Sequence, residues 1–152
     1  MKPGMQQAGA DLRTGEITLS IESQFENVFL IGLAVNKIAS FIPVSKQAAF
    51  EMEIAVVEAV NNAIEHAHRH QRGKRVTVRL NLLSDRIQFT VVDRGVELDF
   101  KALMGTSAGI ENADEIERGR GLKIIDALMD EVRYERKGET NQITLVKYLN
   151  RA

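Results

Sequence analysis

Two pairs of segments with alternating apolar and polar residues constrain the fold of this chain more than any other feature. Four stretches share the pattern, namely 75–83, 86–92, 131–136 and 142–149. Ser84-Asp85 separates the first two stretches and Gly138 lies between the last two. Period-two alternation broken by a turn is typical of an antiparallel hairpin with one buried face. The chain is therefore expected to form a sheet that packs against a core on one side.

Segments with helical periodicity fall between these strands. Helices are expected over residues 23–41, 45–68 and 119–129, with a shorter one near 98–104. Ser23 followed by Glu26 forms a capping box for the first helix, and Ser45 can cap the second. An alternating stretch at 16–22 predicts one more strand. The order β-α-α-β-β-loop-α-β-β predicts an α+β two-layer sandwich with helices on one face.

Length and composition favour one domain. Residues 1–15 contain three glycines and a proline without periodicity, which indicates a flexible N-terminal tail before a single domain at 16–152. Apolar residues make up 44% of the chain, but no run is long enough to span a membrane. The N-terminus lacks a secretory pattern and cysteine is absent, so a cytoplasmic protein is the simplest interpretation.

The charge of the chain excludes a global attraction to anionic partners. The formal net charge is −1, so neither nucleic acid nor a membrane is an expected partner. The local basic cluster at 68–75 is interpreted as a solvated loop, with a phosphate or acidic-partner patch as the alternative. His66 and His70 share a helical face, but no further zinc ligand is evident, so surface or capping roles are favoured for these histidines.

The helix at 45–68 carries a polar stripe that calls for a chemical reason. Glu58, Asn62 and His66 follow one another at four-residue spacing, beside Ala55 and Ala59. A solvated helix face is the simplest explanation, but asparagine is a poor residue in a helix interior. The Asn62 side chain is suited to bind Mg²⁺, which prefers oxygen ligands. Glu58, one turn earlier, is suited to accept a proton from an attacking hydroxyl or water.

Two further motifs suit a nucleotide. Asp93 ends an apolar strand just before Gly95, where it can accept a hydrogen bond from an exocyclic amine such as that of adenine, or simply form a turn. Gly119-Arg120-Gly121 is expected to open a helix, and exposed N–H groups at a helix start favour phosphate. The irregular stretch at 96–118 lies between these motifs and is expected to form a lid.

In this order and spacing, the motifs resemble those of the GHKL (histidine kinase-like) ATPase superfamily, in the branch of anti-sigma factors and serine-protein kinases. The resemblance covers about 16–149. The residues that match the N box and the two glycine boxes are Glu58, Asn62, His66, Asp93, Gly95, Gly119, Gly121 and Leu122. The resemblance implies a Bergerat-type sandwich with a mixed, mostly antiparallel sheet.

The resemblance also implies an activity. Glu58 would be the catalytic base, Asn62 the Mg²⁺ ligand and Asp93 the adenine contact, while Gly119 and Gly121 would lie at the phosphates of ATP. The chain would be an anti-sigma factor with ATP-dependent serine/threonine-protein kinase activity. It would bind either a sigma factor or a STAS-type anti-sigma factor antagonist, and phosphorylation of the antagonist would free it for the sigma factor. A homodimer is a further expectation.

Two positions depart from the family pattern. Glu97 stands where the first glycine box often has its second glycine. Asn141 stands where a threonine is often found on the penultimate strand, with nearby Thr144 as the alternative nucleotide contact. These departures motivate one alternative, a non-catalytic protein-binding regulator with a degenerate nucleotide site. A second alternative is an ATPase-type regulator of another signalling protein.

Overall fold

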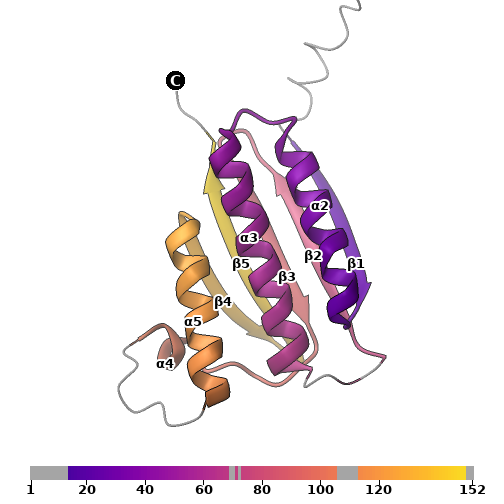
Figure 1. The fold of residues 1–152 in the computed structure, drawn as a ribbon, viewed down its shortest axis with the longest axis vertical. Helices are drawn as coiled ribbons and strands as arrows, with labels where there is room; N and C mark the ends of the chain where they lie inside the picture. The colour runs from indigo at the N-terminus through magenta and orange to yellow at the C-terminus, as the bar shows by residue number, and fades with distance from the viewer. Residues whose placement is uncertain (1–13, 69–70, 72, 106–112, 150–152) are drawn as a thin grey trace, which may run out of the picture.

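The computed structural model describes residues 14–68, 71, 73–105 and 113–149. Five strands and their connecting helices follow the expected order (Figure 1). The strands are β1 (Gly15–Glu22), β2 (Arg75–Leu82), β3 (Arg86–Asp93), β4 (Glu131–Lys137) and β5 (Thr140–Tyr148). The tail expected at 1–15 lies almost entirely outside the described residues, and the last tail residue belongs to β1.

The strands form one sheet in the order β1-β2-β3-β5-β4. All four pairings are antiparallel, so the described sheet is antiparallel throughout rather than mixed. Both expected hairpins, β2–β3 and β4–β5, are confirmed, and Gly138 makes the second turn with a φ of 58°. The β3–β5 register places Asp93 directly opposite Asn141, which joins two motifs that are far apart in the sequence.

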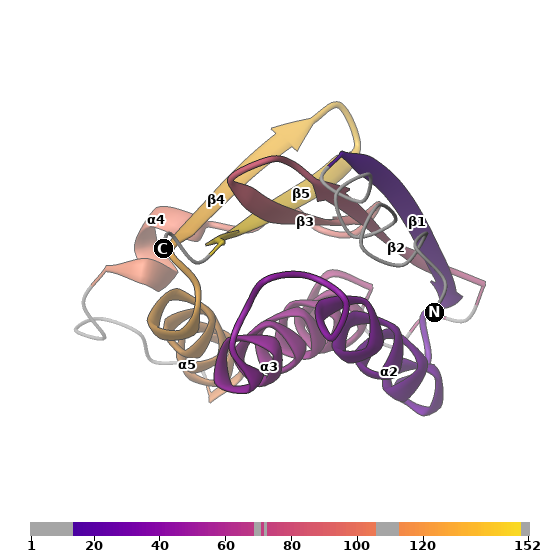
Figure 2. The same cartoon turned by 90° about the horizontal axis from the view of Figure 1, so that it is seen from above.

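Three helices cover one face of this sheet, as Figure 2 shows from above. They are α2 (Val28–Ala39), α3 (Lys46–Asn62) and α5 (Ala113–Leu128). A short helix, α4 (Phe100–Met104), lies beside α5 and confirms the element expected near 98–104. The predicted α+β sandwich with helices on one face is therefore confirmed. Among the described residues, no helix is long and apolar enough to cross a membrane.

The predicted cap of α3 is present, whereas the predicted cap of the first helix is absent. Ser45 caps α3, since its side chain accepts a hydrogen bond from the Ala48 N–H at 3.0 Å. The capping box proposed for Ser23 is wrong. The chain first makes a 3₁₀ turn, η1 (Phe25–Asn27), without a side-chain cap, and the buried Ser23 hydroxyl pairs with His68 instead.

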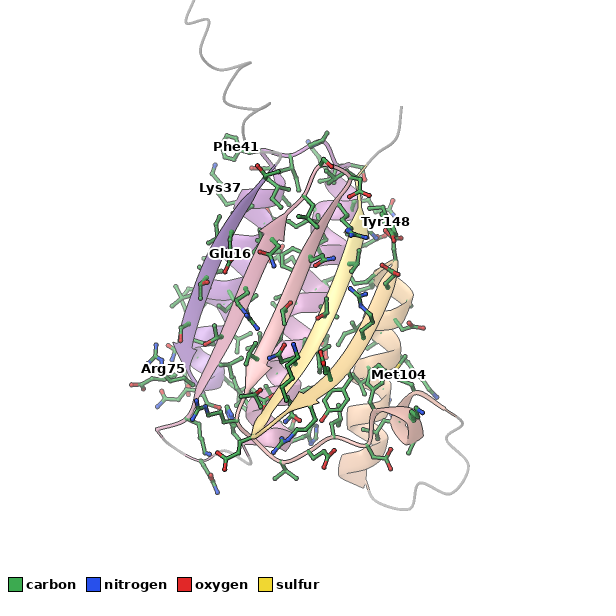
Figure 3. The ribbon with its side chains drawn as sticks, turned by 180° about the vertical axis from the view of Figure 1, so that it is seen from behind. Glu16, Lys37, Phe41, Arg75, Met104 and Tyr148 are labelled. Carbon is green, nitrogen blue, oxygen red and sulfur yellow. The ribbon has the colours of Figure 1, made fainter. Side chains whose placement is uncertain are left out.

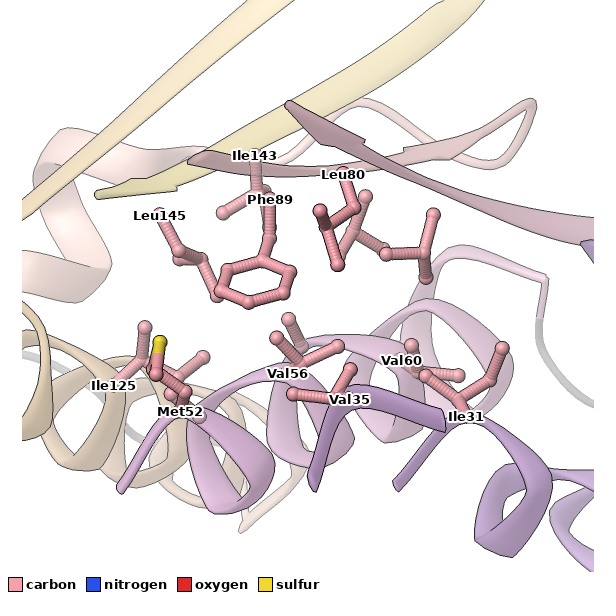
Figure 4. Packing of buried hydrophobic residues seen from close by; sticks show 14 of the residues in the cluster. Ile31, Val35, Met52, Val56, Val60, Leu80, Phe89, Ile125, Ile143 and Leu145 are labelled. Atoms are coloured by element: carbon pink, nitrogen blue, oxygen red, sulfur yellow. The ribbon is translucent and has the colours of Figure 1, made fainter. Parts of the chain in front are cut away.

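The core lies between the helices and the sheet. Figure 4 shows Val35, Met52, Val56 and Ile125 of the helices facing Phe89 of the sheet. Phe89 and Met52 are completely buried. Burying a side chain of this size contributes roughly 1.5–3 kcal/mol relative to leaving it exposed. The alternation of apolar and polar residues in the strands therefore determines which face of the sheet the helices cover.

The opposite face of the sheet is polar and open, as seen from behind in Figure 3. Thr90 and Thr144 lie side by side on it, with their hydroxyl oxygens 3.5 Å apart. Along the strands, Arg75 and Met104 mark one end of the molecule, while Phe41 and Tyr148 mark the other (Figure 3).

Candidate functional site

Four of the predicted site residues meet around one small cavity between α3 and the sheet. Its lining residues are Asn62, Ala63, His66, Asp93, Val96, Leu98, Asn141 and Ile143. The cavity has a volume of about 20 Å³, and a single water needs about 10–15 Å³ measured in this way. The cavity is therefore narrow, with polar groups contributed by α3, β3 and β5.

Asp93 presents one carboxylate oxygen to the protein and keeps the other available. Its Oδ1 accepts hydrogen bonds from the Gly95 N–H at 2.7 Å and from Asn141 Nδ2 at 2.8 Å. Within the described part of the chain, Oδ2 makes no hydrogen bond. Asp93 as a whole is only 5% exposed. A carboxylate oxygen next to a cavity is suited to accept a hydrogen bond from a ligand amine.

All hydrogen-bonding groups of the Asn141 side chain bind groups of the protein itself. Its Nδ2 donates to Asp93 Oδ1 and to the Val96 carbonyl, both at 2.8 Å. Its Oδ1 accepts from the Tyr134 hydroxyl at 2.6 Å and from Arg136 Nη1 at 3.1 Å. These four bonds fill the donors and acceptors of an amide. Asn141 lies in the site as predicted, but its polar atoms point to protein groups.

Asn62 touches the glycine motif. A Cβ added to Gly121 would lie 3.1 Å from both Nδ2 and Oδ1 of Asn62, so the absence of a side chain at Gly121 permits this contact. The Nδ2 atom of Asn62 is buried and has no hydrogen-bond partner among the described residues. An unsatisfied buried amide is costly, on the order of 1–3 kcal/mol. The unpaired nitrogen of Asn62 is therefore suited to donate a hydrogen bond to a ligand, while its oxygen fits the preferences of Mg²⁺.

Glu58 and His66 flank Asn62 on the same helical path. Glu58 is half-buried one turn before Asn62 and is not among the lining residues of the cavity. His66 is buried and lines the cavity. It belongs to a π-helical turn, η2 (Ala63–Ala67), that directly follows Asn62. Single π turns frequently occur at functional sites, and this one shifts the register of the helix where the cavity begins.

The alanines beside this stripe do not face a ligand. Ala55 and Ala59 are completely buried, and α3 packs against α5. The two small alanine side chains therefore allow α3 to pack closely in the described structure.

His68 is not a surface residue as the sequence suggested. It is 1% exposed, and its Nδ1 lies 2.8 Å from Ser23 Oγ. Burial lowers the pKa of His68, and nearby Lys74 lowers it further, whereas Asp93 opposes the shift. The imidazole is therefore neutral at pH 7 and ties the end of η2 to the segment between β1 and η1. His70 lies outside the described residues, and no group of three or more His, Asp or Glu residues suited to a metal occurs in the described ranges.

The second glycine motif lies inside a helix rather than at its start. Because α5 begins at Ala113, the N–H groups of Gly119 and Gly121 are not those of a free helix end. The prediction that these glycines form a phosphate site at a helix N-terminus is therefore corrected. Gly119 faces the Leu103 carbonyl of α4. Arg120 is exposed and Leu122 is buried in the core.

Thr144 and Glu97 lie away from the cavity. Thr144 faces the open side of the sheet, opposite to the side that carries Asp93 and Asn141. Glu97 is exposed and does not line the cavity. The carboxylate that suggested a degenerate site is therefore not in the cavity. In the expected lid, residues 106–112 lie outside the described part of the chain.

Two residues of the site were missed by the sequence analysis. The Tyr134 hydroxyl accepts a hydrogen bond from the Leu98 N–H at 3.0 Å, and Arg136 Nη1 donates to the Gly95 carbonyl at 2.7 Å. Both side chains come from β4 and reach the segment that follows Asp93. The polar groups of Tyr134 and Arg136 on an alternating strand were a signal of a functional role. The groups that they bind became evident only from the order of the strands in the sheet.

Comparisons with known proteins point to one family. The model of the histidine kinase-like ATPase domain matches residues 21–147. The chain is 30% identical over 138 residues to the serine-protein kinase RsbW of Bacillus subtilis (strain 168), covering 88% of this chain and 86% of that protein. It is also 30% identical over 140 residues to the RsbW protein of Listeria innocua serovar 6a, covering 89% of this chain and 88% of that protein.

A solved structure shares the fold. It contains the RsbU and RsbW domains of Rv1364c from Mycobacterium tuberculosis and aligns with a TM-score of 0.61 at 18% identity. The alignment covers 91% of this chain and 34% of that chain.

Proposed function

This chain belongs to the histidine kinase-like ATPase family, in the branch of the RsbW serine-protein kinases, and from this membership we propose that it is an anti-sigma factor with ATP-dependent serine/threonine-protein kinase activity. Its proposed substrate is a serine of a STAS-type anti-sigma factor antagonist. Its second proposed partner is a sigma factor, which it sequesters in the cytoplasm when the antagonist is phosphorylated.

The meeting of Asn62, His66, Asp93 and Asn141 at one cavity is the observation that carries the nucleotide-binding part of this proposal. Asp93 Oδ2 would accept a hydrogen bond from the amino group of adenine. Asn62 would bind Mg²⁺ through its side-chain oxygen. The bound Mg²⁺ would supply charge neutralisation for the phosphates of ATP.

Glu58 is the proposed proton acceptor for the serine hydroxyl. It lies one helical turn before Asn62, so the base and the ion ligand share one rigid helix. Protein phosphoryl transfer depends mainly on alignment and charge neutralisation, and the base completes the alignment of the attacking oxygen. The helix keeps this separation fixed in both the free and the bound protein.

The cavity must widen to accept the base of a nucleotide, because its present volume is close to that of one water. The contact between Asn62 and Gly121 joins α3 to α5 at this point. Separation of α5 and α4 from α3 is therefore the proposed entry step.

The exposed face of η1 and α2 is the proposed contact for the sigma factor. Phe25, Phe29 and Leu33 recur at four-residue spacing, and Phe29 and Leu33 are 61% and 60% exposed. Contiguous exposed apolar side chains commonly mark protein-binding surfaces. Phe29→Asp should weaken capture of the sigma factor. Phe50→Asp is a matched control, since Phe50 is also exposed but lies near the N-terminal end of the antiparallel neighbour α3.

Incubation with labelled ATP, Mg²⁺ and the candidate antagonist tests the proposed activity. The wild-type protein should transfer label to a serine of the antagonist. Glu58→Gln should abolish transfer while ADP binding is retained, and Asn62→Ala should weaken Mg²⁺-dependent binding as well. Nucleotide binding without transfer would favour an ATPase-type regulator if phosphate is released. Absence of any adenine-nucleotide binding would leave a protein-binding regulator with a degenerate site.

A further inference from the structure

We propose that Tyr134 and Arg136 of β4 are positioning residues that, through Asn141, give the site its selectivity for adenine over guanine nucleotides. This inference rests on the proposed nucleotide site at Asp93. Neither residue belongs to the three motifs, and neither lines the cavity. Both act on groups that do line it.

The first step concerns the orientation of the Asp93 carboxylate. The Gly95 N–H and Asn141 Nδ2 both bind Oδ1, at 2.7 and 2.8 Å, so rotation of the carboxylate would break two hydrogen bonds. Oδ2 is thereby kept in place as an acceptor. A fixed acceptor favours the amino group of adenine and disfavours the carbonyl oxygen that guanine carries at the same position, because two acceptors would then face each other.

The second step concerns the orientation of Asn141. An asparagine amide can rotate by half a turn and exchange its oxygen and nitrogen, which would place an acceptor against Asp93. The Tyr134 hydroxyl and Arg136 Nη1 both donate to Asn141 Oδ1, at 2.6 and 3.1 Å. Two donors on one oxygen exclude the rotated state. The donor face of Asn141 is thus held toward Asp93.

The third step extends the same control to the segment after Asp93. The Tyr134 hydroxyl accepts the Leu98 N–H at 3.0 Å, and Arg136 Nη1 donates to the Gly95 carbonyl at 2.7 Å. The Tyr134 ring also stacks on Phe100 of α4, with ring centroids 5.6 Å apart. One strand therefore holds both ends of the segment 95–98, which forms part of the cavity wall.

This arrangement gives a physical reason for asparagine at this position. A threonine offers a single hydroxyl and could not donate to Asp93 and Val96 while accepting from Tyr134 and Arg136. The departure of Asn141 from the family pattern is thus matched by two side chains on the neighbouring strand.

Dissociation constants for Mg²⁺-ADP and Mg²⁺-GDP, measured by titration calorimetry, test the inference. Tyr134→Phe and Arg136→Met each remove one of the two donors to Asn141 Oδ1 while keeping most of the side-chain volume. Each should reduce the preference for ADP over GDP about fivefold to tenfold, the factor expected for a lost hydrogen bond. Asn141→Leu should reduce it at least as much. Adding Tyr134→Phe to Asn141→Leu should cause a smaller reduction than Tyr134→Phe causes in the wild type.

Matched controls come from the same hairpin. Tyr148→Phe removes a hydroxyl bonded to Glu131 at 3.0 Å, at the opposite end of the molecule from α4 (Figure 3). Arg133→Met changes an exposed arginine of β4 whose neighbours are on the open face. Both controls should keep the wild-type preference, whatever they do to the melting temperature.

The outcomes separate this inference from the proposed function. If the wild-type protein binds adenine nucleotides but Tyr134→Phe and Arg136→Met keep its preference, the positioning role is overturned and the proposed function stands. If Tyr134→Phe reduces the preference as much in the Asn141→Leu background as in the wild type, the route through Asn141 is wrong. If the wild-type protein binds neither nucleotide, both the proposed function and this inference fail.

Discussion

The contact between Gly121 and Asn62 can be tested by adding one methyl group. Gly121→Ala places a Cβ at 3.1 Å from both terminal atoms of the Asn62 side chain, which is closer than an ordinary van der Waals contact. Gly119→Ala is a matched control two residues earlier in α5. Its Cβ would lie 3.4 Å from the Leu103 carbonyl oxygen and 3.9 Å from Leu103 Cδ2, which are ordinary distances.

The expected free energies follow from two opposing effects. Alanine is more favourable than glycine in a helix interior by about 0.8–1 kcal/mol, so Gly119→Ala should stabilise the protein by this amount. At Gly121 the same gain is offset by overpacking, which typically costs about 1–3 kcal/mol. Gly121→Ala should therefore be neutral or destabilising by up to about 2 kcal/mol. In the Asn62→Ala background the clash is absent, and Gly121→Ala should become stabilising.

Urea denaturation of the nucleotide-free protein measures this difference. The midpoints should change while the slope stays constant, since the surface exposed on unfolding is nearly unchanged. The coupling between positions 62 and 121 is obtained from the double-mutant cycle. If Gly121→Ala stabilises wild type and Asn62→Ala equally, the two residues are not in contact in solution and the arrangement of α5 on α3 described above is incorrect.

Three further substitutions test other parts of the structure. Because burial lowers the pKa of His68 below its ordinary value of 6.5, the unfolded chain binds the proton first, so stability should be complete above about pH 6.5 and fall as the pH decreases. Urea denaturation across this range should show a shallower fall for His68→Gln, and an equally steep one would contradict the assignment. Ser45→Ala should lose about 1 kcal/mol of stability with the α3 cap, whereas Ser84→Ala at an exposed turn should change little. Glu97→Gln should leave ADP affinity within about twofold of wild type, because charges at exposed positions are largely screened; a larger change by calorimetry would place Glu97 at the nucleotide.

The sheet was largely predictable from the sequence because its signal is local. A period of two residues marks each strand, and short turns define the two hairpins. The order of the strands is not local. The pairing of β3 with β5 brings Asp93 opposite Asn141 across 48 residues, and no periodicity in either strand specifies that partner. The antiparallel character of the whole sheet follows from this pairing together with that of β1 and β2, which is also non-local.

Some contacts around the site could not be predicted because the side chains involved bind residues outside their own segment. Ser23 has the spacing of a helix cap, but its hydroxyl is used by His68, which lies 45 residues away. The pattern at 23–26 could not reveal this competitor. The stripe of Glu58, Asn62 and His66 was predictable because it lies on one helix. The roles of Tyr134 and Arg136 were not, because their hydrogen-bond partners belong to β5 and to the segment that follows β3.

The walls of the cavity differ in how firmly they are held, and this difference suggests the direction of opening. The Asp93 side is held by hydrogen bonds through Asn141, Tyr134 and Arg136. Across the cavity, the described contact between Asn62 and Gly121 is a close approach without a hydrogen bond from the Asn62 amide nitrogen. Separating the second pair breaks no described hydrogen bond of the Asn62 amide nitrogen and exposes an amide that can then bind a ligand. A nucleotide should therefore enter by moving α5, while the base meets a carboxylate that is already oriented.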